Sequence, residues 1–277
     1  MYKEELVRFG YSEKDLCKIR ESLCISTYRE DTIYGCAIDN FKFFLDLGYD
    51  SKDIIRMSVK FPKILVYNHD YVLKKISFFE GIGYNRNDVL SMVRKTPQIL
   101  SLRYSNIENK INNLVELGYD KKDIKKMTIL LPTIFSYGID NIKNKIQEIM
   151  KFGYSFDEVI IITSRCPALF GLNISNLESK LDNIVKLGYS RKDVFKMWRL
   201  FPVFIVLDYD NIKKKIDDLE KLGYNRNDVL KITRKYSIIF SLSIDSIKNK
   251  IEYLESLGYE RNDVLKLSIS CPQIYGF

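Results

Sequence analysis

The stretch Leu222-Gly223-Tyr224-Asn225-Arg226-Asn227-Asp228-Val229-Leu230 is one copy of a unit that recurs through the chain. Its Gly-Tyr pair is found eight times in the 277 residues, and every spacing is 35 residues except the first, which is 38. The eight glycines are Gly10, Gly48, Gly83, Gly118, Gly153, Gly188, Gly223 and Gly258. A period of this length is typical of solenoids, in which each unit buries its apolar face only against its neighbours.

The prolines fix the same register independently. All six lie fourteen residues after one of the glycines, and only Ser237 interrupts their series. They are Pro62, Pro97, Pro132, Pro167, Pro202 and Pro272. Because no linker separates the repeats, we expect residues 1–277 to form a single domain.

Each repeat begins with the signals of a helix start. With the glycine counted as position zero, position two is an N-cap residue type in seven of eight copies, and position five is acidic in all eight. The tyrosine at position one precedes an aliphatic residue at position six, which is the spacing of a hydrophobic staple. We expect this helix, helix A, to bury positions six, nine and thirteen and to end before the proline.

The second half of the repeat predicts another helix. A short apolar segment follows the proline, and position twenty-two offers a second cap, such as Asp70 or Ser105. Helix B then runs to the next glycine, which is suited to the left-handed conformation that ends a helix. The predicted fold is all-α: a right- or left-handed α-solenoid of about eight helix, proline connector and helix repeats, with a concave and a convex face.

The positive charge is concentrated on helix A. The chain has 44 basic and 36 acidic residues, for a net charge of +8. Positions eight, eleven and twelve of helix A point away from the predicted buried stripe. Of these 24 places, thirteen are basic and only Glu21 is acidic, whereas the rest of the chain has more acidic than basic residues.

We call these thirteen basic residues the ladder. A one-sided basic stripe is typical of phosphate binding. The predicted nucleic-acid-binding residues are the ladder without Lys18: Arg56, Lys60, Arg94, Lys95, Lys126, Arg165, Lys196, Arg199, Lys231, Arg234, Lys235 and Lys266. The competing interpretation is that cations near helix C-termini only offset the helix dipole.

Other recurring residues favour structural roles. A lysine at position twenty-seven of six repeats, such as Lys75, lies among acids and predicts a solvated convex face. Trp198 and Tyr236 could stack on bases, but their positions in the repeat favour core packing. The tyrosines of the Gly-Tyr pairs are interpreted as staples.

Composition argues against catalysis and metal binding. The one histidine, His69, and five cysteines without a Cys-x-x-Cys pair are too few for a zinc site or a Cys-His nucleophile. We therefore expect no catalytic residues, metal or cofactor. No segment has the apolar length of a signal peptide or a transmembrane helix, which predicts a soluble intracellular chain or a trimmed mature form.

The repeat resembles that of the mitochondrial transcription termination factor (mTERF) family. The resemblance rests on Leu-Gly-Tyr-x-x-x-Asp-Val-x-x-Met, on Pro-x-Ile-Leu, and on Asn-Ile-x-x-Lys-Ile-x-x-Leu as in residues 106–114. It implies two α-helices and a 3₁₀ turn per repeat and nucleic-acid binding on a basic concave face, in the regulation of organellar gene expression. The expected partner is double-stranded DNA first and RNA second, in a mitochondrion or plastid if a presequence has been removed and otherwise in the cytoplasm.

One other repeat class and one other function share features with this sequence. Pentatricopeptide repeats have a similar length and bind RNA, but they do not place a proline after the first helix. The alternative function is a scaffold that binds a protein or peptide, with a partner or a second copy at the C-terminal half repeat that begins at Gly258.

Overall fold

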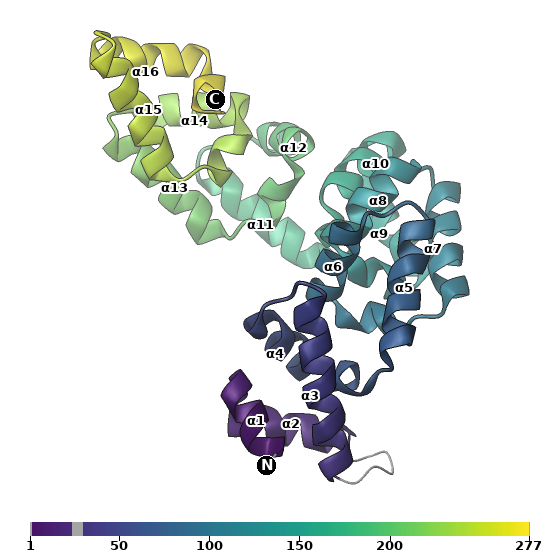
Figure 1. Ribbon diagram of the computed structural model, residues 1–277. Helices are drawn as coiled ribbons and strands as arrows, with labels where there is room; N and C mark the ends of the chain where they lie inside the picture. The colour runs from purple at the N-terminus through teal and green to yellow at the C-terminus, as the bar shows by residue number, and fades with distance from the viewer. Residues whose placement is uncertain (1, 24–29, 277) are drawn as a thin grey trace. The chain divides into compact units, whose positions relative to one another are not determined.

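A computed structural model describes residues 2–23 and 30–276 (Figure 1). In these residues it has sixteen α-helices, seven short 3₁₀ helices and no strand, which confirms the all-α prediction. Helix A of successive repeats is α2 (Glu13–Leu23), α4 (Ser51–Lys60), α6 (Arg86–Lys95), α8 (Lys121–Leu130), α10 (Phe156–Arg165), α12 (Arg191–Leu200), α14 (Arg226–Lys235) and α16 (Arg261–Ser270).

The remaining elements complete the repeats in the predicted order. Helix α1 (Tyr2–Phe9) precedes the first glycine, and helix B of successive repeats is α3 (Glu30–Asp46), α5 (His69–Gly81), α7 (Tyr104–Glu116), α9 (Ile139–Met150), α11 (Ile174–Lys186), α13 (Tyr209–Lys221) and α15 (Ile244–Ser256). The connectors are 3₁₀ helices: η1 (Pro62–Val66), η2 (Pro97–Ser101), η3 (Pro132–Ser136), η4 (Pro167–Gly171), η5 (Pro202–Val206), η6 (Ser237–Ser241) and η7 (Pro272–Gly276).

The chain divides into two compact units, unit 1 up to Ile139 and unit 2 from Asp140. Within unit 1, α2, α4, α6 and α8 contact one another in series. Within unit 2, α10, α12, α14 and α16 form one such series and α11, α13 and α15 form a second. Each unit is therefore a solenoid of stacked repeats, and the single domain over residues 1–277 stays a prediction.

The turn between helix B and helix A follows the sequence signals. Gly188 has a φ of +109°, which a residue with a Cβ adopts only with strain. Two residues later Ser190 caps α12: its hydroxyl accepts from the Asp193 amide at 3.1 Å, and the Asp193 carboxylate accepts from the Ser190 amide at 3.0 Å. This capping box fixes the start of the helix, as predicted.

Two details of the repeat differ from the sequence prediction. Helix A buries position ten beside positions six and nine, as Thr233 shows in α14. Position thirteen is buried in three repeats, half-buried in four and exposed in one. Position thirteen precedes the proline and has an extended φ, for example −136° at Phe201, so its side chain leaves the helical stripe. Helix B is capped at position twenty, where Asn68 accepts from the Asp70 amide, and position twenty-two lies in the first turn.

The tyrosines of the Gly-Tyr pairs also form hydrogen bonds to the next repeat. Seven of the eight are at most 8% exposed, and several hydroxyls reach position ten of the next repeat. The Tyr84 hydroxyl lies 2.7 Å from Thr128 Oγ1, and the Tyr189 hydroxyl lies 2.7 Å from Thr233 Oγ1. Where position ten is Trp198, Tyr154 instead donates to the Phe195 carbonyl at position seven. The tyrosine thus joins each of these repeats to the next.

No helix among the described residues has the length and apolar character needed to span a membrane.

Candidate nucleic-acid interface

The twelve predicted binding residues all lie on A helices of the two units. Eleven of them are exposed and Arg234 is half-buried. Lys18, the remaining ladder residue, is exposed on α2. The helical spacing of positions eight, eleven and twelve therefore brings them to the solvent side of helix A, as their pattern predicts.

Each unit carries its own part of the ladder. In unit 1, the neighbouring helices α4, α6 and α8 present Arg56, Lys60, Arg94, Lys95 and Lys126. In unit 2, the neighbouring helices α10, α12, α14 and α16 present Arg165, Lys196, Arg199, Lys231, Arg234, Lys235 and Lys266. Because successive A helices are in contact, cations that are 35 residues apart in sequence lie on adjacent helices.

The ladder is less free of acids than its sequence pattern indicates. Position five of helix A lies beside position eleven of the next repeat, so an acid meets an arginine there. Arg199 pairs with Glu158 at 2.9 Å, and Arg234 with Asp193 at 3.5 Å. The ladder positions themselves include a single acid, but helices that are adjacent in space bring position five of one repeat to the arginine of the next.

Unit 1 has the same arrangement around Asp53. The carboxylate of Asp53 lies 2.6 Å from Arg94 Nε, and it also pairs with Arg56 of its own helix at 2.5 Å. The Asp53 side chain is only 13% exposed, against 42% for Arg94. The acid therefore lies beneath the arginine rather than in front of it.

These contacts lower the pKa values of the acids in unit 2. The pKa of Glu158 is below its usual value because its carboxylate accepts from the Ser155 amide and then from Arg199. For Asp193, partial burial opposes the shift, but the hydrogen bonds from Ser190 and the charge of Arg234 outweigh it and lower the pKa. Both acids stay ionised at neutral pH and partly neutralise the arginines.

Three ladder lysines at position twelve also have a structural contact. Lys60 Nζ donates to the Lys95 carbonyl and Lys95 Nζ to the Ile129 carbonyl, each at 2.7 Å. Lys235 Nζ donates to the Ile269 carbonyl at 3.1 Å. These carbonyls belong to the last turn of the next A helix and lack a partner within that helix. For these lysines, the interpretation as helix-terminal cations has direct structural support.

Three other ladder residues keep their charged groups unengaged. Among the described residues, no hydrogen bond or ion pair involves the side chains of Lys126, Arg165 or Lys196. All three are exposed, on α8, α10 and α12. A phosphate can bind them without breaking an existing contact.

The lysines at position twenty-seven of helix B contradict the sequence interpretation. Lys75 is 1% exposed and donates to the Leu102 carbonyl at 2.5 Å, and Lys110 is 8% exposed and donates to the Tyr137 carbonyl. Burial lowers the pKa of both amines. They bridge helix B to the end of the next 3₁₀ connector instead of covering a solvated face. The sequence signal that could have revealed this bridging role was the recurrence of lysine at one position of six repeats among variable neighbours.

Of the two candidate stacking residues, Trp198 packs inside the protein, as predicted, whereas Tyr236 is only partly covered. Trp198 is fully buried at position ten of α12 and meets the Tyr154 ring edge-on at 5.3 Å. Tyr236 is half-buried at position thirteen. His69 stacks on Phe43, with ring centroids 4.1 Å apart. Trp198, which is buried, and His69, which lies on helix B, are therefore not presented with the ladder.

A family model described as mTERF matches residues 4–152 and 184–277. The chain belongs to the mTERF family. Members of this family bind nucleic acids and regulate organellar gene expression, typically without enzymatic activity. The unmatched stretch between the two ranges has the same order of elements as the other repeats, with α10, η4 and the start of α11. A comparison with curated proteins found no match.

Proposed function

We propose that this mTERF protein is a non-enzymatic nucleic-acid-binding protein that regulates transcription or gene expression. The favoured ligand is duplex DNA, and the second choice is RNA. Either is held in a basic concave groove formed along the ladder. The observation that carries the proposal is the exposure of ladder cations on adjacent A helices in each unit. The organellar work of the family favours a mitochondrion or plastid, after removal of any presequence, over the cytoplasm.

The ladder would bind by charge rather than by reading bases. Each phosphate that a lysine or arginine neutralises releases condensed counterions, so affinity falls steeply with salt. Contacts of this kind position a nucleic acid without specifying its sequence. Lys126, Arg165 and Lys196 can each bind a phosphate without giving up an intramolecular contact, so they are the first residues to test.

The test is fluorescence anisotropy with labelled duplex DNA, single-stranded DNA and RNA of about 22 nucleotides, each at several salt concentrations. The wild type should bind duplex DNA most tightly. The triple variant Lys126→Glu, Arg165→Glu and Lys196→Glu should bind much more weakly. Its log-log salt slope should be smaller by about three, since each lost phosphate contact removes about 0.9.

A matched control separates the ladder from total charge. The control is a second triple variant, which makes the same charge change at exposed places on B helices: Lys74→Glu, Lys143→Glu and Lys213→Glu. This control variant should lose far less affinity for duplex DNA than the ladder triple variant does. Equal losses on both faces would contradict the ladder assignment, and no binding of any probe at low salt would contradict the function.

A second candidate function has one specific observation in its favour. Tyr259 is 56% exposed, unlike the other seven Gly-Tyr tyrosines, and Leu257 and Tyr253 beside it are 58% and 60% exposed. This apolar surface fits a protein partner or a second copy of the chain. Light scattering after size exclusion tests self-association, which Leu257→Lys should abolish. A monomer that binds nucleic acid would favour the first function.

A further inference from the structure

Three ladder arginines share one arrangement that the proposed function does not itself require. Each lies at position eleven and is held by the position-five acid of the preceding repeat. The pairs are Asp53 with Arg94 in unit 1, and Glu158 with Arg199 and Asp193 with Arg234 in unit 2.

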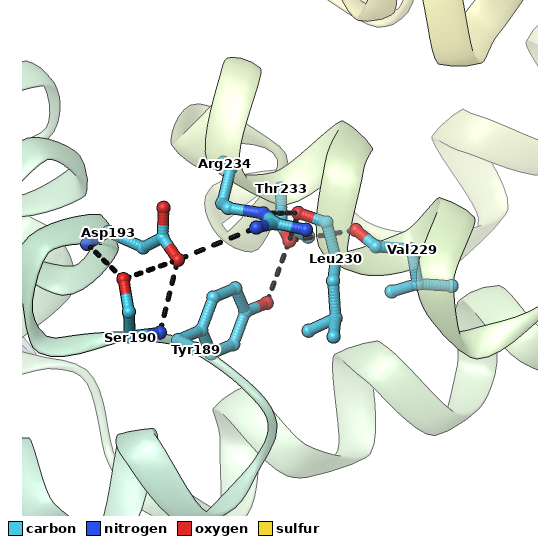
Figure 2. Close-up of polar contacts among 7 residues, drawn as sticks. All are labelled: Tyr189, Ser190, Asp193, Val229, Leu230, Thr233 and Arg234. Carbon is cyan, nitrogen blue, oxygen red and sulfur yellow. Dashed lines mark hydrogen bonds and ion pairs between the residues drawn. The ribbon is translucent and has the colours of Figure 1, made fainter.

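The pair in α12 and α14 shows how the arginine is held (Figure 2). Arg234 Nε donates to the Leu230 carbonyl of its own helix at 2.9 Å, and its Nη1 faces Asp193 Oδ2 at 3.5 Å. Asp193 is itself fixed, because Oδ2 accepts from the Ser190 amide at 3.0 Å and from the Ser190 hydroxyl at 2.7 Å. The guanidinium is thus anchored at two of its three nitrogens.

Nη2 remains available in all three arginines, but only Arg234 is held at both other nitrogens, since Arg94 pairs through Nε alone and Arg199 through Nη1 alone. Within the described residues, no hydrogen bond involves Nη2 of Arg94, Arg199 or Arg234. A guanidinium carries five N–H donors in a rigid plane, so fixing one edge also fixes the direction of the others. The arginine is held before any ligand arrives.

The acids lie deeper than the arginines they hold. The side chains of Glu158 and Asp193 are 31% and 26% exposed, whereas those of Arg199 and Arg234 are 53% and 38% exposed. A polyanion that approaches from solvent therefore meets the guanidinium first. The acid behind it lies within a Debye length of a phosphate bound there, so its repulsion opposes the gain from holding the arginine.

We propose that Asp53, Glu158 and Asp193 are positioning residues that hold Arg94, Arg199 and Arg234 ready for nucleic-acid phosphates. The proposal rests on the proposed function, because it concerns how the same ladder binds. An anchored arginine loses less side-chain freedom on binding than a free one. Counting charges predicts the opposite effect, that each acid weakens binding.

The experiment tests whether removing the acid's charge weakens binding, as positioning predicts, or strengthens it, as charge counting predicts. Each acid is replaced by its amide, which removes the negative charge but keeps an acceptor for the helix cap. The variants are Asp53→Asn, Glu158→Gln and Asp193→Asn. Measured by anisotropy with duplex DNA, each variant should bind about threefold more weakly than the wild type, and the triple variant more weakly still. Far-UV circular dichroism and the urea midpoint check that the fold is retained.

Asp123→Asn is the matched control. Asp123 also lies at position five, but position eleven of the following repeat is Ser164, so the sequence offers no arginine to hold. This variant removes the same charge and should bind as tightly as the wild type or more tightly. A loss of affinity equal to that of Asp193→Asn would overturn the proposal.

A double-mutant cycle tests whether the acid acts through its arginine. In a chain that carries Arg234→Gln, Asp193→Asn should weaken binding no further. The same threefold loss in that background, or tighter binding by the amide variants, would overturn the positioning role while leaving nucleic-acid binding intact. Absence of binding by the wild type would instead overturn the proposed function, and the positioning role with it.

Discussion

The hydrogen bond between Tyr189 and Thr233 predicts which of two variants, Tyr189→Phe or Thr233→Val, loses more stability. Thr233 Oγ1 already donates to the Val229 carbonyl at 2.8 Å, so the proton in its 2.7 Å contact with Tyr189 must come from the tyrosine (Figure 2). Tyr189→Phe removes that donor from a buried site. The loss of one buried hydrogen bond of this kind should lower the free energy of unfolding by about 1 kcal/mol.

Thr233→Val should cost less, although it removes the acceptor of the same bond. An orphaned buried hydroxyl would cost about 1–3 kcal/mol. The structure contains the alternative, however: beside Val93, the Tyr49 hydroxyl donates to the position-seven carbonyl of Leu90 at 2.9 Å. In Thr233→Val, the hydroxyl of Tyr189 can turn to the corresponding carbonyl of Leu230. There it replaces Arg234 Nε, which donates to that carbonyl at 2.9 Å and is near enough to solvent to bond water instead. We therefore expect a loss of about 0.5 kcal/mol.

Urea unfolding followed by the fluorescence of the single tryptophan measures both changes. Trp198 is buried in α12 and reports on unit 2. With an m-value of about 2 kcal/mol/M, Tyr189→Phe should lower the midpoint by about 0.5 M and Thr233→Val by about half as much. A larger loss for Thr233→Val than for Tyr189→Phe would refute the reasoning, because the tyrosine would then have no second acceptor within reach.

Two further predictions concern alkaline pH and the turn glycines. Burial raises the pKa of Tyr84 and of Tyr189 from 10.0 to about 12, so the unfolded chain releases these protons first. Stability should therefore fall by about 1.4 kcal/mol per pH unit for each such tyrosine between about pH 10 and pH 12, and tyrosinate absorbance at about 295 nm should appear together with the loss of helical circular dichroism. Tyrosinate formation that precedes the loss of helix would contradict this coupling. For the glycines, Gly188→Ala should lower the thermal midpoint more than Gly48→Ala, because both residues have positive φ but only at Gly188 would the new Cβ lie 2.9 Å from a Leu230 methyl. Equal losses would mean that Leu230 moves aside without cost.

The elements of one repeat could be predicted from the sequence because their signals are local. Gly188, Ser190 and Asp193 act on one another within six residues, and Pro202 ends the helix that they begin. The family resemblance rests on the same residues, and the family match confirms it. Helix A and the outward direction of the ladder followed from this register alone.

The contacts between repeats were not predictable in the same way. Tyr189 and Thr233 are 44 residues apart, and Asp193 and Arg234 are 41 apart, so no pattern within one repeat pairs them. The lysines of helix B were misassigned for the same reason, since the carbonyl that accepts from Lys75 belongs to the next repeat.

The two ways of satisfying the tyrosine have a consequence for how such a chain can change in length. A repeat with a hydroxyl at position ten accepts the preceding tyrosine through that side chain, and a repeat with Val93 or Trp198 there accepts it through the main chain. In each of the contacts described above, the acceptor lies on helix A of the next repeat and the tyrosine is the donor. Internal repeats are therefore interchangeable parts, and a gene that gained or lost 35 codons in register would encode a protein whose new junction already has its donor and its acceptor.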